Sequence, residues 1–151
     1  MSTSQEILKY IKSYLKDVNR ILFLLESKMP KSSPGKLWQS YIEDEGEYPD
    51  LEISSFKRHG TGILVKYKNR TVDFDFSDLN LYKMGINHSS EFVTIDTGFL
   101  VSYIESIGVE NKELTYYAGL ERNLKTLTEE GLLYYFQYRF YLPEDLEKLK
   151  L

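Results

Sequence analysis

The chain has no cysteine, two histidines, one tryptophan and four prolines among its 151 residues. The absence of cysteine excludes disulfides, thiolate metal ligands and a cysteine nucleophile. Lysine and arginine interrupt the N-terminal segment, whose longest apolar run, residues 21–25, is far below the ~20 residues that a membrane span needs. A secretory signal requires an uninterrupted apolar stretch, which this segment lacks. We therefore expect a cytoplasmic protein that has no contact with a membrane.

The composition is that of a folded domain. Hydrophobic residues make up 42% and charged residues 28% of the chain, which is too apolar for a disordered protein. Aromatic residues reach 15%, with thirteen tyrosines. A chain of 17.8 kDa suits one domain, residues 1–151, that buries a core without cross-links. The net charge of −4 argues against a general nucleic-acid binder.

Apolar residues at steps of three and four predict a long N-terminal helix over residues 1–29, which Pro30 ends. The expected buried stripe of this helix comprises Ile7, Ile11, Tyr14, Leu15, Val18, Ile21, Leu22, Leu25 and Met29. Most lysines of the segment lie off that stripe. The helix is therefore expected to cover one side of the core.

The apolar pattern changes to a period of two over residues 53–95, which predicts a mostly antiparallel sheet rich in hairpins. Strands are expected over 62–67 and 70–76, joined by a tight turn at 68–69 whose asparagine supplies the positive φ. A further strand is expected over 91–95. This region forms the central sheet.

Residues 96–151 are expected to form two helices and a final strand. Asp96 stands at the N-cap position of the first helix, and Gly108 closes it. The second helix is expected over 111–130, with a buried side formed by Leu114, Tyr117, Leu120, Leu124 and Leu127. The tyrosine-rich run 132–142 is interpreted as a strand, with a buried helix as the alternative at this length. Helices at both ends of an antiparallel sheet make an α+β domain.

Residues 43–52 hold six acids and no base. Gly46 and Pro49 favour a loop, and a solvated surface loop is the plain interpretation. The alternative is a docking surface for a basic partner, because clustered carboxylates steer association and neighbouring tyrosines can anchor it. The side chains assigned to this surface are Tyr41, Glu43, Asp44, Glu45, Glu47, Tyr48 and Asp50.

Three aspartates, Asp73, Asp75 and Asp78, form a second candidate contact. With His59, the first two also offer the ligand types of a small metal-dependent hydrolase. No ligand-spaced motif accompanies them, and alternating Asp and Phe is equally typical of a half-buried strand with a solvated face. We therefore expect no catalytic residue, no metal and no cofactor.

The basic run within residues 53–70 contains five lysines and arginines. Acidic segments flank it on both sides, so its field is largely cancelled within a Debye length or two. Nucleic-acid binding is not expected.

Two motifs carry a family resemblance: His59-Gly60-Thr61-Gly62 entering a strand, and Val72-Asp73-Phe74-Asp75-Phe76 soon after it. Asp96, Gly98 and Phe99 then open a helix, and the tyrosine-rich strand closes the domain. In these features the chain resembles an uncharacterised bacterial domain family associated with immunity against polymorphic or contact-dependent toxins.

The resemblance implies an immunity protein, a binding protein rather than an enzyme, whose partner is the C-terminal domain of a cognate toxin. An acidic, tyrosine-rich surface suits a basic toxin domain such as a nuclease. A monomer or weak homodimer is expected. Two alternatives stay open: a metal-dependent hydrolase using His59 with Asp73 and Asp75, and a structural module that self-associates through its tyrosine-rich strand.

Overall fold

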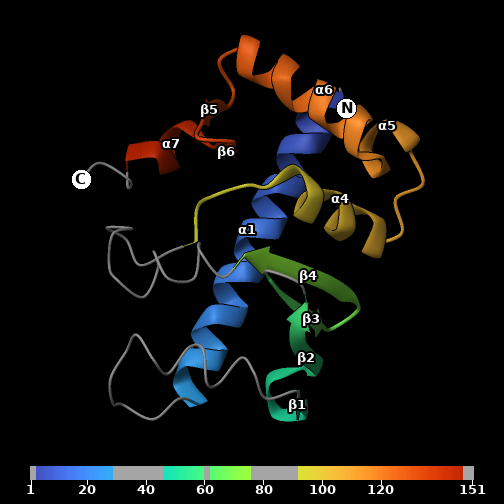
Figure 1. Cartoon of the computed structure of the whole chain (residues 1–151), viewed down its shortest axis with the longest axis vertical. Coiled ribbons are helices and arrows are strands. Elements are labelled where there is room, and N and C mark those ends of the chain that lie inside the picture. Colours follow the sequence, from blue (N-terminus) through green and yellow to red (C-terminus); the bar gives the residue numbers. More distant parts are fainter. Residues whose placement is uncertain (1–2, 29–45, 60–61, 76–91, 148–151) are drawn as a thin grey trace.

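The structure, a computed structural model, describes residues 3–28, 46–59, 62–75 and 92–147 (Figure 1). It has the predicted α+β architecture: a long helix, a four-stranded antiparallel sheet, further helices and a C-terminal pair of strands. In the parts of the chain that it describes, no helix is both long and apolar enough to cross a membrane.

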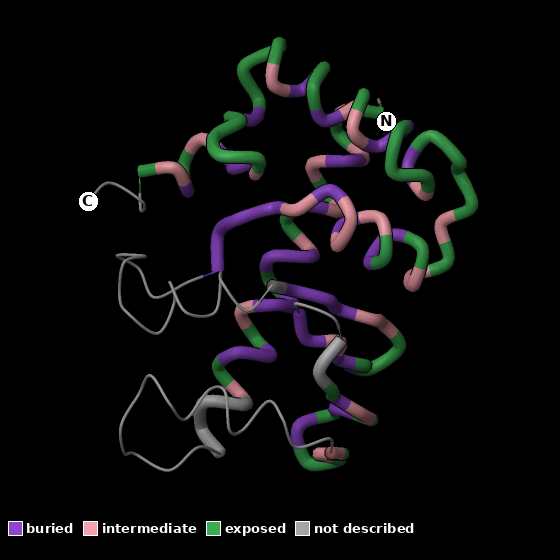
Figure 2. Tube along the Cα trace, in the orientation of Figure 1, coloured by how far each residue is buried: buried purple, intermediate pink, exposed green. Residues whose placement is uncertain are grey.

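Helix α1 (Thr3–Lys28) confirms the predicted N-terminal helix. Its 26 residues extend over about 39 Å at 1.5 Å per residue, which lets it contact the sheet at one end of the molecule and the helices at the other (Figure 1). Buried positions recur along it (Figure 2) and comprise Ile7, Ile11, Tyr14, Leu15, Val18, Ile21 and Leu22. Leu25 and Met29 of the predicted stripe lie outside the described side chains.

The sheet has the strand order β1-β2-β3-β4, with every neighbouring pair antiparallel. The strands are β1 (Gly46–Tyr48), β2 (Ile53–His59), β3 (Gly62–Tyr67) and β4 (Arg70–Asp75). One face supplies core residues from three strands: Ile53, Phe56, Ile63, Val65, Tyr67, Val72 and Phe74. The predicted hairpin of β3 and β4 is confirmed; residue 76 lies outside the described residues.

The turn between β3 and β4 differs from the prediction in one detail. The positive φ falls on Lys68 (55°) and not on Asn69. The Lys68 N–H donates to the carbonyl of Glu52 over 2.9 Å, so a contact outside the hairpin fixes the conformation of this turn. The turn is thereby fastened to the chain that enters β2.

Residues 46–51 of the predicted acidic loop form regular secondary structure, which corrects the loop assignment for this part of the segment. Gly46 pairs with Phe56 in the sheet, and a short 3-10 helix, η1 (Pro49–Leu51), follows β1. The Tyr48 ring packs against Phe56 with centroids 5.2 Å apart, and Leu51 is buried. These apolar contacts hold the segment against the sheet.

Side-chain hydroxyls from two helices cover the outer edge of β4. The Tyr14 hydroxyl of α1 donates to the carbonyl of Asp73 over 2.8 Å. The Ser106 hydroxyl of α4 (Thr97–Ser106) lies 3.4 Å from the carbonyl of Thr71. Since exposed strand edges favour aggregation, these contacts protect this edge of the sheet.

The predicted strand 91–95 is wrong for the residues that the structure describes. Only Ile95 makes a β-bridge, an antiparallel one with Phe140. The side-chain amide of Asn19 instead donates to the carbonyl of Phe92 and accepts from its N–H. A side chain therefore supplies the backbone partners that a neighbouring strand would have provided.

Helix α4 confirms the predicted helix after Asp96, whose carboxylate accepts from the Phe99 N–H, and Gly108 follows it with φ 87°. The single helix predicted over 111–130 is wrong. It is divided at Tyr116 into α5 (Lys112–Thr115) and α6 (Tyr117–Glu129).

The two helices approach each other closely on either side of this break. A Cβ on Gly119 would lie 2.9 Å from the carbonyl oxygen of Glu113, so glycine at this position allows the two segments to pack in tight contact. Leu114, Leu120, Leu124 and Leu127 are buried as predicted, whereas Tyr117 is 55% exposed.

The run 132–142 forms a hairpin and not the single strand that was predicted. Strands β5 (Tyr134–Phe136) and β6 (Arg139–Tyr141) pair antiparallel. Gln137 and Tyr138 make the turn with φ of 50° and 67°, and positive φ at both central residues is the type I′ geometry. Helix α7 (Pro143–Leu146) follows.

Candidate functional site

The described part of the predicted acidic segment begins with β1, which is an edge strand of the sheet among the described residues. Glu47 and Asp50 are exposed, and Tyr48 is half-buried. Glu52, which was not assigned to the contact from sequence, is exposed beside them. We call Glu47, Asp50 and Glu52 the acidic edge. Tyr41, Glu43, Asp44 and Glu45 lie outside the described residues.

An open groove of about 470 Å³ runs along the acidic edge. Its lining comprises Glu47, Pro49, Glu52, Ile53, Ser54, Lys68 and Asn69. The Lys68 ammonium lies 3.6 Å from the Glu52 carboxylate, and both side chains are about half exposed or more. An exposed pair of this kind is weak, so Glu52 keeps most of its capacity to interact with a partner.

The three aspartates of the second predicted contact do not form one exposed surface in the described residues. Asp73 is 7% exposed, which overturns the expectation of a solvated strand face at this position. The side chain of Asp75 and all of Asp78 lie outside the described part of the structure.

The strand register aligns two of the three residues of the metal hypothesis, His59 and Asp75, whose side chains lie outside the described ones; Asp73 pairs with Leu64 instead. His59 pairs with Gly62, which in turn pairs with Asp75, so the three backbone positions form one row across β2, β3 and β4. A Cβ on Gly62 would lie 2.7 Å from the Phe74 carbonyl oxygen, which explains the glycine. In the described ranges no three His, Cys, Asp or Glu side chains are grouped as metal ligands.

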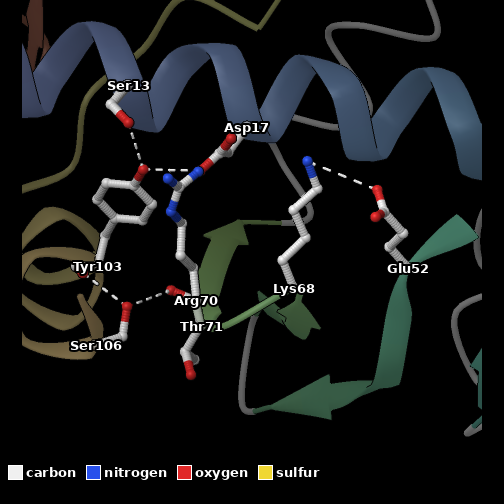
Figure 3. Close-up of polar contacts among 8 residues, drawn as sticks. All are labelled: Ser13, Asp17, Glu52, Lys68, Arg70, Thr71, Tyr103 and Ser106. Atoms are coloured by element: carbon white, nitrogen blue, oxygen red, sulfur yellow. Dashed lines mark hydrogen bonds and ion pairs between the residues drawn. The ribbon is translucent and has the colours of Figure 1, made fainter.

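A second polar site, which the sequence analysis missed, joins α1, β4 and α4 (Figure 3). The Asp17 carboxylate accepts from the Arg70 guanidinium over 2.8 Å and from the Tyr103 hydroxyl over 2.7 Å, both on Oδ2. The Ser13 hydroxyl lies 2.7 Å from that of Tyr103. Because Tyr103 gives its one hydrogen to Asp17, Ser13 is the donor to Tyr103.

This arrangement stabilises the neutral phenol and the charged guanidinium. Burial raises the pKa of Tyr103 to about 12; the hydrogen bond from Ser13 lowers it, while the one to Asp17 raises it. The hydrogen bond to Asp17 also raises the pKa of Arg70. The buried carboxylate of Asp17 therefore has a permanent positive partner and a neutral donor.

Beside this network an open groove of about 590 Å³ lies between α1 and the β3–β4 turn. Four cationic side chains line it: Lys16, Arg20, Lys68 and Arg70. Ser13, Asp17 and Tyr67 complete the lining. We call it the basic groove. The charge count along the sequence missed it because its cations come from two segments about 50 residues apart.

Exposed aromatic residues gather on the C-terminal hairpin. Tyr134, Tyr135, Phe136 and Tyr138 are 48–86% exposed. An ion pair of 2.8 Å between Arg139 and Asp96 fixes the hairpin to the start of α4. Figure 1 places the hairpin and β1 toward opposite ends of the molecule, so the aromatic hairpin and the acidic edge are separate surfaces.

A family model described as a domain of unknown function, DUF6896, matches residues 7–143, which is most of the chain. No curated protein and no solved structure matches the chain.

Proposed function

The chain belongs to the DUF6896 family, whose function is unknown, and we propose that it is an immunity protein, which binds a cognate bacterial toxin domain in the cytoplasm and blocks its active site. It acts by binding and not by catalysis. The toxin association comes from the sequence resemblance given above. The structure contributes a surface suited to such binding.

The observation that carries the proposal is the exposed acidic edge. Glu47, Asp50 and Glu52 stand within six residues on an ordered part of the sheet edge, next to an open groove. Because β1 and η1 are held by sheet pairing and by the contact of Tyr48 with Phe56, these carboxylates need little ordering on binding. Preorganised charge of one sign favours fast association with a partner of the opposite sign.

A nuclease toxin fits this chemistry because its substrate is a polyanion. An active site that binds phosphodiesters is positively charged, and a row of carboxylates can occupy it as a phosphate backbone would. Glu43, Asp44 and Glu45 directly precede the acidic edge in the sequence, and with Tyr41 they belong to the proposed contact. Asp75 and Asp78 stay in the proposal as a second contact, whereas the buried Asp73 is not used.

The experiment is capture of the partner followed by an inhibition assay. The tagged full chain is purified from its native cells, bound proteins are identified by mass spectrometry, and the C-terminal domain of the captured protein is expressed alone. We expect a basic domain whose toxic activity the purified chain abolishes at a 1:1 ratio. A captured domain that stays fully active with excess chain would contradict the proposal.

The cross-strand row of His59, Gly62 and Asp75 favours the metal-dependent hydrolase as a second candidate. Bound metal stabilises a fold by mass action, so chelation separates the two functions. For an immunity protein that holds no metal, EDTA leaves the melting temperature of the purified chain unchanged. A fall that added Mg²⁺, Mn²⁺ or Zn²⁺ reverses would favour the hydrolase.

A further inference from the structure

The basic groove collects positive charge that the described part of the fold does not neutralise. Four cations line it and one carboxylate, that of Asp17, faces them. Asp17 is paired with Arg70 and Glu52 with Lys68, which within the described residues leaves the charges of Lys16 and Arg20. Within the described residues, neither Lys16 nor Arg20 forms an ion pair, and both are exposed.

The placement of these cations is unfavourable without an anion. Lys16 and Arg20 are four residues apart on α1, and like charges at that spacing repel each other across one turn. The β3–β4 turn adds Lys68 and Arg70 from the opposite side of the groove. A bound anion between the two elements would convert this repulsion into attraction.

Two of the cations are held in position before any ligand arrives. Arg70 gives Nη1 to Asp17, whose carboxylate thereby orients the guanidinium, and the Arg70 side chain is still 40% exposed (Figure 3). Lys68 lies in the β3–β4 turn, where its backbone N–H donates to the carbonyl of Glu52. Its ammonium lies 5.3 Å from the centre of the Tyr67 ring. A preorganised guanidinium with free N–H groups matches the oxygens of a phosphate.

We propose that the basic groove binds a phosphate-bearing small molecule, with Lys16 and Arg20 contacting it from α1 and Lys68 and Arg70 from the β3–β4 turn. A phosphate group carries up to two charges and a pyrophosphate more, which suits Lys16 and Arg20, together with the exposed ends of Lys68 and Arg70, better than a single carboxylate does. The site shares Lys68 with the groove along the acidic edge, where that ammonium lies 3.6 Å from the Glu52 carboxylate, but its ligand is not a protein partner.

Titration calorimetry of the purified full chain tests this proposal, with sodium pyrophosphate as the probe and sodium acetate at equal ionic strength as the reference. The test variant is Lys16→Gln/Arg20→Gln. The control, Lys9→Gln/Lys12→Gln, removes the same charge from exposed positions of the same helix outside the groove. Neither variant removes a buried group, and circular dichroism confirms that both are folded.

We expect the wild type and the control to bind pyrophosphate with the same affinity, and the test variant to bind at least about tenfold more weakly. Equally weakened pyrophosphate binding in both variants would mean that only net charge matters, and would contradict a specific site in the basic groove. Absence of pyrophosphate binding would overturn it as well. Binding of an acidic hexapeptide in place of pyrophosphate would assign the groove to protein carboxylates and not to phosphate.

Discussion

Arg70 and Asp17 are 53 residues apart in the chain, and their side chains meet at 2.8 Å. The same carboxylate oxygen accepts from Tyr103, so one buried atom joins α1, β4 and α4. The long helix is thereby tied to the sheet and to the helices that follow it. The position of the basic groove therefore depends on this ion pair.

Replacing Arg70 by methionine is expected to destabilise the fold by about 2 kcal/mol. The substitution leaves the Asp17 carboxylate, 6% exposed, without its positive partner, and such a loss costs about 3–5 kcal/mol when both partners are fully buried. Arg70 is 40% exposed, so the cost is lower. Urea unfolding measures it.

Lys125→Met is the matched control, since it removes the exposed Lys125–Glu121 pair of α6. That variant is expected to cost less than about 0.5 kcal/mol. Equal effects of the two substitutions would contradict a structural role for the Asp17 network.

The pKa of Tyr103 predicts how stability changes at alkaline pH. The folded pKa is about 12 and the ordinary pKa of tyrosine is about 10, so the stabilisation is complete below pH 10. Above pH 10 the unfolded chain ionises first, and the free energy of unfolding falls as the pH rises to about 12. Each pKa unit corresponds to about 1.4 kcal/mol.

Unfolding of wild type and Tyr103→Phe at pH 8 and pH 11 tests this assignment. Because phenylalanine cannot ionise, the variant is expected to lose less stability between the two pH values than the wild type does. Tyr138→Phe, at a position 86% exposed, should keep the wild-type difference. Identical pH profiles for all three proteins would show that Tyr103 has no such role.

Asp96 connects α4 with the C-terminal hairpin through its two oxygens. Oδ1 accepts from the Phe99 N–H, and Oδ2 accepts from Arg139. Asp96→Ala is expected to cost about 1–2 kcal/mol, mostly from the lost cap. Asp96→Asn retains a cap acceptor, so thermal unfolding should place it between wild type and Asp96→Ala. Equal melting temperatures for the two variants would mean that the ion pair dominates.

The exposed hairpin raises the question of self-association. In the described residues β5 has β6 as its one strand neighbour, and its other edge is open. β5 has only three residues, so pairing of this strand with a second copy buries too little surface for a stable dimer, whose interface needs about 1,000 Å². Light scattering is therefore expected to give the monomer mass of 17.8 kDa at about 100 µM. A dimer that Phe136→Ser dissociates would support the self-associating module instead.

Elements with strong local signals could be predicted from the sequence. The apolar stripe of α1 and the Asp96 cap depend on neighbouring residues alone. The break at Tyr116 and the Gln137-Tyr138 turn have no such signal, because neither contains glycine, proline or asparagine. In the fold the break accompanies the contact of Gly119 with Glu113, and the turn accompanies the pairing of Phe136 with Arg139.

The two candidate sites also differ in whether the sequence alone could predict them. The acidic edge is visible from a charge count, since its residues lie within one short segment. The basic groove forms only when the fold brings Lys16 and Arg20 to Lys68 and Arg70. Like charges at i and i+4 do not mark it in the sequence, because Lys12 and Lys16 have the same spacing as Lys16 and Arg20 and Lys12 lies outside the groove.

The central claim is that the acidic edge binds a basic toxin domain. The most direct test is the association rate of the captured domain with wild type, with Glu47→Lys/Asp50→Lys, and with Glu129→Lys/Glu130→Lys as a charge-matched control at exposed positions of α6 and its end. At low salt the reversal at the acidic edge is expected to slow association about tenfold or more, and the control should stay near the wild-type rate. Equal rates for the two reversed variants would contradict the claim.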